Sequence, residues 1–121
     1  MKPILLSVLL GLGVIFSPAM AQDPFLLERA QGGDPISQNK LGVMYRRGDG
    51  APQDNKAALY WYTQAAEQGY SHSQYNLGQM YHQGRGVPKD DDMAAIWFCL
   101  AAEQGHAQAQ KNLDRMGQPA C

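Results

Sequence analysis

The chain contains few residues of the kinds that carry enzyme chemistry. Its 121 residues include two cysteines and three histidines. The histidines, His72, His82 and His106, do not form an i, i+4 pair, and none has a cysteine at zinc-ligand spacing. No nucleophile elbow is present. The sequence therefore predicts no catalytic residue, no bound metal and no cofactor.

The chain also lacks an excess of positive charge. It holds ten Lys and Arg against eleven Asp and Glu, which gives a formal net charge of −1. Nucleic-acid binding requires a concentrated basic surface. We therefore expect no nucleic-acid partner.

Residues 1–21 have the layout of a cleaved secretory signal. Lys2 gives a positive start, an apolar run fills 4–16, and small residues occupy the −3 and −1 positions. Cleavage near Ala21 removes Lys2 and no acid, leaving nine Lys and Arg against eleven Asp and Glu, a net charge of −2. An uncleaved anchor is the alternative, but the run is short for a span of about 20 residues. We expect a mature domain, 22–121, that is periplasmic or secreted and does not span a membrane.

The sequence repeats itself at a spacing of 36 residues without any insertion. A fixed period of this length is typical of solenoids, in which each unit buries its apolar face on its neighbour. The recurring pairs include Leu41 and Leu77, Gly42 and Gly78, Tyr45 and Tyr81, Ala58 and Ala94, Trp61 and Trp97, Ala65 and Ala101, and Gly69 and Gly105.

Each repeat contains two stretches with the periodicity of an amphipathic helix. The first of these carries a glycine at one fixed register, Gly42 and Gly78, which costs about 1 kcal/mol of helix propensity relative to alanine. We expect the backbone of another helix to come very close there. The second stretch carries a tryptophan followed by another aromatic residue, and we expect both to pack in the core as its large side chains.

Turn and capping residues separate these stretches. Each first helix is followed by a turn that contains two glycines and a proline. Asp54 and Asp90 precede the second helix of each repeat and are suited to capping it. Asp91 and Asp92 would then occupy the first turn, where the helix dipole favours negative charge. This interpretation is preferred to a metal site because no other acidic cluster accompanies them.

The period extends beyond the two full units on both sides. We expect an all-α fold, an α/α superhelical solenoid of antiparallel helix pairs with two full repeats and a half repeat at each end, five helices in total. The expected segments are a partial repeat helix at 22–33, full repeats at 34–69 and 70–105, and a capping helix and tail at 106–121.

The two cysteines are Cys99, in a predicted helix, and Cys121. Two cysteines in an exported chain suggest a disulfide. A bond between them would close a loop of about 22 residues and contribute about 3 kcal/mol of stability. Two free thiols, or pairing of Cys121 between chains, are the alternatives.

Together these residues resemble the Sel-1-like repeat family, a relative of the tetratricopeptide repeats. The resemblance covers roughly 28–116 and rests on Ala-Ala-Glu-Gln-Gly, Ala-x-Ala-Gln-x-x-Leu and Tyr-x-x-Gly-x-Gly-Val, followed by Asp, Ala and Trp. It implies an α/α superhelix that acts as a protein-interaction module, often in bacterial envelope or signalling pathways. Some exported relatives carry a cysteine pair within each unit. This chain does not, so their disulfide scheme does not transfer.

A partner is expected on the side of the first helices that lies opposite the Leu–Gly–Tyr stripe. This side should be exposed, and the resemblance implies that it lines a concave groove. Tyr75 is the expected anchor for an extended segment or helix of another envelope protein, and basic residues are expected to contact its polar groups. Ordinary solvent exposure is the alternative explanation for this side. The candidate groove residues are Asn39, Val43, Arg46, Tyr75, Gln79, His82, Lys111 and Arg115.

The sequence thus predicts an exported protein–protein interaction module, an adaptor or regulatory binding protein of the bacterial cell envelope, and not an enzyme. Two alternatives stay open. One is a hydrolase acting on cell-wall or β-lactam substrates, which has been suggested for some cysteine-containing exported relatives. The other is a self-associating structural subunit that dimerises through its terminal half-units. The chain is expected to be a monomer or a weak dimer.

Overall fold

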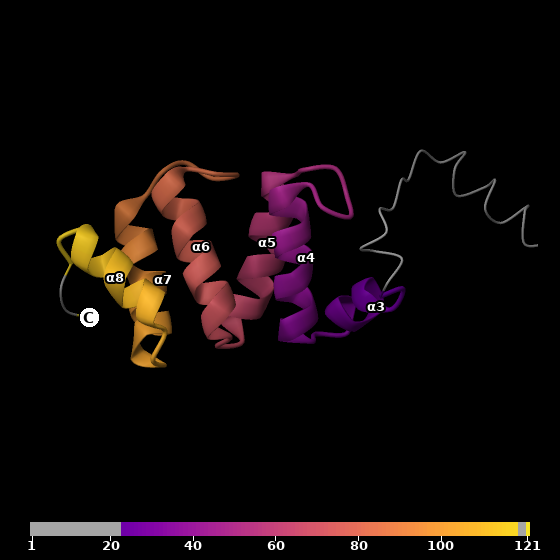
Figure 1. Ribbon diagram of the computed structural model, residues 1–121, viewed down its shortest axis with the longest axis horizontal. Helices are drawn as coiled ribbons and strands as arrows, with labels where there is room; N and C mark the ends of the chain where they lie inside the picture. Colours follow the sequence, from indigo (N-terminus) through magenta and orange to yellow (C-terminus); the bar gives the residue numbers. More distant parts are fainter. Residues whose placement is uncertain (1–22, 119–120) are drawn as a thin grey trace, which may run out of the picture.

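The computed structural model describes residues 23–118 and Cys121. Its helices follow one another along the long axis of the molecule (Figure 1). The predicted signal, 1–21, lies outside the described residues. Within the described part of the chain there are six helices and no strands: α3 (Leu26–Gln31), α4 (Pro35–Arg47), α5 (Asn55–Glu67), α6 (Ser71–Gln83), α7 (Asp91–Glu103) and α8 (Ala107–Arg115).

Each helix packs against the next one in the chain, which confirms the all-α solenoid. The pairs α4–α5 and α6–α7 form the two full units, and α5 packs on α6 between them. Helix α3 covers α4 at one end, and α8 covers α7 at the other (Figure 1). The expected total of five helices was wrong, because each half unit supplies a helix in addition to the four of the full units.

Aspartate side chains begin three of the helices. The Asp54 carboxylate accepts the N–H of Ala57 at 3.1 Å, and the Asp90 carboxylate accepts that of Met93 at 3.0 Å. Both predicted caps are therefore confirmed, and Asp91 and Asp92 occupy the first turn of α7. Asp34 caps α4 in the same way. These caps satisfy N–H groups that have no partner inside the helix.

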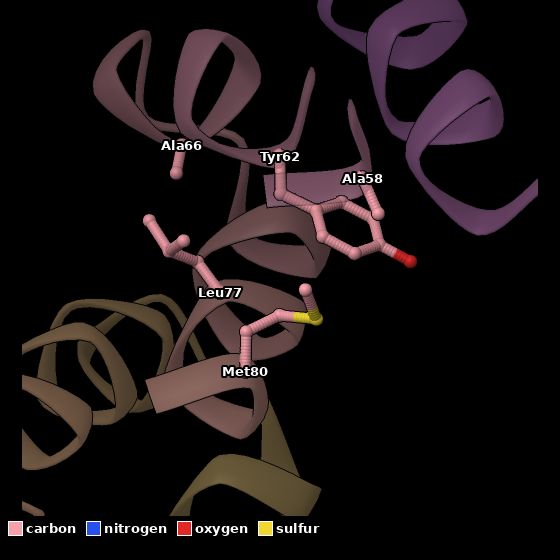
Figure 2. Packing of buried hydrophobic residues seen from close by; sticks show 5 residues of the cluster. All are labelled: Ala58, Tyr62, Ala66, Leu77 and Met80. Atoms are coloured by element: carbon pink, nitrogen blue, oxygen red, sulfur yellow. The ribbon is translucent and has the colours of Figure 1, made fainter. Parts of the chain in front are cut away.

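The core is divided into small clusters, each of which joins neighbouring helices. One cluster lies between α5 and α6, and Figure 2 shows its side chains. It consists of Ala58, Tyr62, Ala66, Leu77 and Met80. A second lies between α7 and α8 and consists of Ala94, Phe98, Ala101, Ala109 and Leu113. Each unit therefore completes its core only with the helix that follows.

Only one aromatic residue of each predicted pair is fully buried. Tyr62 and Phe98 are 0% exposed. Trp61 and Trp97 are partly buried and pack at the edge of the cluster that joins their own unit to the preceding one. The prediction of core packing is therefore confirmed, with the tryptophans only partly buried, because a helix places consecutive residues about 100° apart.

The glycine that recurs at one position of each first helix has a different cause from the one expected. A Cβ built on Gly42 would lie 2.5 Å from Cδ1 of Tyr62, and one on Gly78 would lie 2.7 Å from Cδ1 of Phe98. The close neighbour is therefore an aromatic ring of the following helix and not a helix backbone. Each glycine leaves space for the ring that fills the core of its unit.

Replacement of Gly78 by Ala is expected to destabilise the protein by about 1–3 kcal/mol, because overpacking against the buried Phe98 ring outweighs the gain in helix propensity. Urea unfolding followed by circular dichroism measures the change. Phe98→Leu removes the ring, so Gly78→Ala should cost less in that background. A G78A protein as stable as the parent would contradict the ring-on-glycine contact.

Two glutamines lie on the apolar stripe and are only 4% exposed, Gln38 and Gln74. The amide of Gln38 donates to the Ala30 carbonyl at 3.0 Å, and that of Gln74 donates to the Ala66 carbonyl at 3.3 Å. In each case the amide oxygen accepts a bond of 2.8 Å from the glutamine that ends the following helix. Because buried polar groups need partners, these glutamines connect the end of one unit to the next.

A disulfide joins Cys99 of α7 to Cys121, with the two Cα atoms 5.4 Å apart and a sequence separation of 22. Helix α8 lies between the two cysteines in the chain. The bond therefore encloses the capping helix within a covalent loop.

Candidate functional site

Two adjoining pockets lie along α6, one between α4 and α6 and the other between α6, α7 and α8. They share Gln79 and Gln83, and we call them together the Gln79 groove. The first has a volume of about 360 Å³ and is lined by Arg46, Tyr75, Asn76, Gln79, Met80, Gln83 and Arg85. The second has a volume of about 480 Å³ and is lined by Gln79, His82, Gln83, Asp91, Asn112, Arg115, Met116 and Gln118.

Most of the residues predicted for the groove line it, but not all. The lining includes Arg46, Tyr75, Gln79, His82 and Arg115. Asn39, Val43 and Lys111 do not line either pocket. Whether any of these residues contacts a partner remains a prediction.

Asn39 and Val43 are not freely exposed, because the first helices of the two units stand side by side. The Asn39 side-chain oxygen accepts bonds from Ser73 at 2.8 Å and from Asn76 at 3.0 Å. Val43 packs against the cluster that contains Tyr62. The expectation of exposure was wrong for these two residues, which join neighbouring units. Lys111 is exposed on α8 but lies outside the groove.

Sequence reasoning missed part of the lining, and Arg85 is the clearest case. Arg85 follows α6 in a turn, where the helical wheel gives no direction for a side chain. A signal was nevertheless present, because Arg85 stands where the first repeat has Asp49. The turn thus changes its charge between repeats, which marks a position not determined by packing.

Tyr75 is held by the fold and is only partly exposed. Its ring stacks on His106 with a centroid distance of 4.6 Å and contacts Phe98 at 5.8 Å. Its hydroxyl accepts a 2.6 Å hydrogen bond from the Gln79 amide. Tyr75 therefore presents its hydroxyl edge to the groove while its ring packs on its neighbours, and its role as an anchor stays a prediction.

Three arginines surround the groove. Nε of Arg46 donates to the Tyr62 hydroxyl at 3.2 Å, which opposes the upward shift that burial gives to the Tyr62 pKa. Arg85 and Arg115 are exposed. Between residues 23 and 118, the ion pairs involve Arg29, His82 and Lys89, so none of the groove arginines has a carboxylate partner there.

The lining contains one carboxylate, Asp91, and it is already paired. Its Oδ1 lies 2.7 Å from Nδ1 of His82 and 3.1 Å from Nζ of Lys89. Hydrogen bonds from these two groups hold the pKa of Asp91 below its usual value. The free charge of the groove is therefore positive.

The lining of the groove bears on the hydrolase alternative. Its lining includes no serine, threonine or cysteine that could act as a nucleophile. Throughout the described residues there is no group of three or more His, Cys, Asp or Glu side chains that could hold a metal ion. No helix in the described ranges is both long enough and apolar enough to cross a membrane.

A histidine cap lies beside the groove at the start of α8. Nδ1 of His106 accepts the N–H of Ala109 at 3.3 Å, and the His72 ring lies 5.4 Å away. Burial, and to a lesser extent the charge of His72, lowers the pKa of His106 below its usual value. A protonated Nδ1 cannot accept a bond, so the cap requires neutral imidazole.

Acidification is therefore expected to destabilise the α8 end. Since the unfolded chain keeps the His106 proton to a higher pH than the folded chain, the contribution is complete above about pH 6.5 and decreases as the pH falls toward the lower folded pKa. In thermal melts between pH 8 and pH 5, the melting temperature should fall less for His106→Asn than for the parent protein, because asparagine caps without titrating. If the melting temperature falls equally in the variant and the parent, groups other than His106 cause the destabilisation.

The architecture and the groove define a class, that of helical-repeat proteins with a polar groove. The Sel1 repeat model matches residues 35–70 and 71–106. The chain therefore belongs to the Sel1 repeat family, as the sequence resemblance predicted. Sel1 repeats generally mediate protein–protein interaction and are generally not catalytic.

Solved structures with the same fold include bacterial proteins. A Sel1 repeat protein from Oxalobacter formigenes has a TM-score of 0.74 and 40% identity, covering 76% of this chain and 69% of that one. A protective antigen present in uropathogenic Escherichia coli strains has a TM-score of 0.76 and 36% identity, covering 79% of this chain and 21% of that one. The cysteine-rich protein B of Helicobacter pylori has a TM-score of 0.70 at 23% identity and shares the fold.

One curated relative is much longer than this chain. A sel1-like repeat-containing protein of Acanthamoeba polyphaga mimivirus is 44% identical over 48 residues, which is 40% of this chain and 9% of that protein. This chain thus matches a small part of that relative.

Proposed function

We propose that this chain is an exported protein-binding module whose Gln79 groove holds an extended segment or helix of a partner protein. The observation that carries the proposal is the lining of the groove. In the described residues it combines side-chain amides with arginines that have no carboxylate partner, and it contains no serine, threonine or cysteine. The family supplies the general activity, because Sel1 repeats bind protein partners. An adaptor or regulatory protein of the bacterial cell envelope fits this description best.

Export is supported by two features of different kinds. The chain starts with a charged and apolar segment that has the form of a secretory signal. It also contains a disulfide, a bond that persists in oxidising compartments and is rare in the cytosol. Both features support a periplasmic or secreted location.

The test uses variants that change the groove without disturbing the core. Tyr75 is unsuitable because its ring packs on Phe98 and His106. Arg85→Glu combined with Arg115→Glu reverses two exposed charges of the lining. Arg47→Glu combined with Lys56→Glu makes the same charge change at exposed residues outside it.

A partner is first captured by crosslinking in intact envelopes and is then purified. Its affinity is measured for the parent and for both double variants by isothermal titration calorimetry. We expect R85E/R115E to weaken binding by tenfold or more, a loss of about 1.4 kcal/mol or more, and R47E/K56E to leave it unchanged. Equal affinity for all three proteins would remove the Gln79 groove as the binding surface.

Self-association is a second candidate, and exposed apolar residues at the α3 end favour it. Phe25 is 62% exposed and Ile36 is 58% exposed. In a full solenoid a preceding unit would cover this end. Sedimentation across a concentration series should show a dimer that Phe25→Ser and Ile36→Ser weaken, whereas a monomer at every concentration would exclude this candidate.

A further inference from the structure

The first pocket of the Gln79 groove brings together two cationic side chains and no acidic one. Arg46 reaches it from α4, and Arg85 reaches it from the turn after α6. The other lining residues are Tyr75, Asn76, Gln79, Met80 and Gln83, all of which are uncharged. Two guanidinium groups on one small pocket repel each other, and a bound carboxylate would relieve that repulsion.

This local charge is opposite to that of the molecule as a whole. The chain has one more acidic than basic residue, and four of its acidic residues outside the groove, Asp23, Asp34, Asp54 and Asp90, form caps or an ion pair. In the described residues no carboxylate pairs with Arg46 or Arg85. The arginines are therefore available for a ligand.

The second pocket has the same positive character as the first. Arg115 lies on its rim, and its single carboxylate, Asp91, is paired with His82 and Lys89. A ligand that continues from the first pocket into the second would meet a third guanidinium group. It would meet no unpaired negative charge in the lining.

Side-chain amides join the two pockets. Gln79 and Gln83 line both, and Asn112 and Gln118 line the second. Each amide side chain has two N–H donors and an oxygen with two lone pairs. Gln79 uses one donor on the Tyr75 hydroxyl, and its oxygen accepts a bond of 3.3 Å from Gln83. The remaining donors and lone pairs match the alternating N–H and C=O groups of an extended main chain. This pattern favours a peptide over a compact anion or a nucleic acid, which requires a broader basic surface.

We propose that the Gln79 groove selects an acidic segment of its partner protein. One carboxylate of the segment lies between Arg46 and Arg85, its main chain follows the amides of Gln79 and Gln83, and a second carboxylate reaches Arg115. This inference rests on the proposed function, since it specifies the chemistry of the segment that the same groove holds. Arginine suits this task because its planar fork of N–H groups binds a carboxylate through two hydrogen bonds.

The experiment compares two fluorescein-labelled peptides of twelve residues, one of alternating Asp and Gly and one with Asn in place of each Asp. Fluorescence anisotropy measures binding to the purified, oxidised protein at 50 mM and 300 mM salt. We expect the acidic peptide to bind at least tenfold more tightly than the neutral one, and the difference to decrease at high salt. Arg85→Gln combined with Arg115→Gln should weaken acidic-peptide binding about tenfold or more.

The controls separate the charge of the groove from other effects. Arg47→Gln combined with Lys56→Gln removes two exposed cations outside the groove and should leave acidic-peptide affinity unchanged. Arg46→Gln is tested together with a thermal melt, because Arg46 also bonds to Tyr62.

Three results would overturn the inference. They are no binding of the acidic peptide, an equal loss of acidic-peptide affinity in R85Q/R115Q and R47Q/K56Q, or tighter binding of a twelve-nucleotide single-stranded DNA than of the acidic peptide. If both peptides bind equally and R85Q/R115Q weakens both, the preference for acidic segments is wrong while the protein-binding groove stands. The proposed function fails separately, when the purified native partner binds R85E/R115E as well as the parent.

Discussion

Replacement of Phe98 by Ala is expected to lower the free energy of unfolding by about 3–5 kcal/mol. Phe98 is 0% exposed. Its ring fills the space above Gly78 and belongs to the cluster that joins α7 to α8. A domain of this size has a total stability of about 5–15 kcal/mol. The loss is therefore a large part of the total, and urea unfolding measures it.

The neighbouring Trp97 provides the matched control. It is only partly buried, and its Nε1 is the one side-chain polar atom in the described residues that is buried without a hydrogen-bond partner. Trp97→Phe loses some contact area but also removes an unsatisfied donor, a group that costs about 1–3 kcal/mol. We expect a change of less than about 1.5 kcal/mol. If W97F proves more damaging than F98A, the assignment of the core aromatics is wrong.

Loss of the disulfide is expected to lower the free energy of unfolding by about 3 kcal/mol, the value for a closed loop of about 22 residues. Cys99 and Cys121 enclose α8, which packs on α7 and has no helix on its other side in the described chain. The bond therefore limits the freedom of the unfolded chain at an end of the solenoid, where α8 packs against only one neighbouring helix.

Cys121→Ser tests this, because Cys121 is exposed and its loss leaves no cavity. Its melting temperature should fall and should not respond to reductant, whereas the parent should fall to a similar value when reductant is added. A parent protein that melts at the same temperature with and without reductant would contradict the prediction.

The fold could be predicted from the sequence because the capping residues and the apolar residues of the helices recur at the same spacing of 36 residues. Asp54 and Asp90 mark the starts of equivalent helices, and a full 36-residue copy tells which residues are structural. What it could not give was the identity of contacts within a stripe. Gly42 was expected to contact a helix backbone and instead lies against the Tyr62 ring. The periodicity defines which face of a helix is buried but not which atoms that face contacts.

The candidate groove was predicted in part for a related reason. A helical wheel places Arg46, Gln79 and His82 on one side of their helices, and all three line the groove. It does not show how closely neighbouring helices approach, so Asn39 was expected to be exposed and instead bonds to the next unit. It also does not apply to turns, so Arg85 was missed.

The central claim, that the Gln79 groove is a binding surface for a protein segment, is tested most directly by NMR. Backbone amide and arginine Nε–Hε resonances are followed while the twelve-residue acidic peptide is added to the ¹⁵N-labelled protein. The account predicts shifts for Arg46, Arg85 and Arg115 and none for Arg29 and Arg47. Shifts confined to the exposed outer residues of α5 and α7, such as Tyr60 and Ile96, with the groove arginines unchanged, would contradict it.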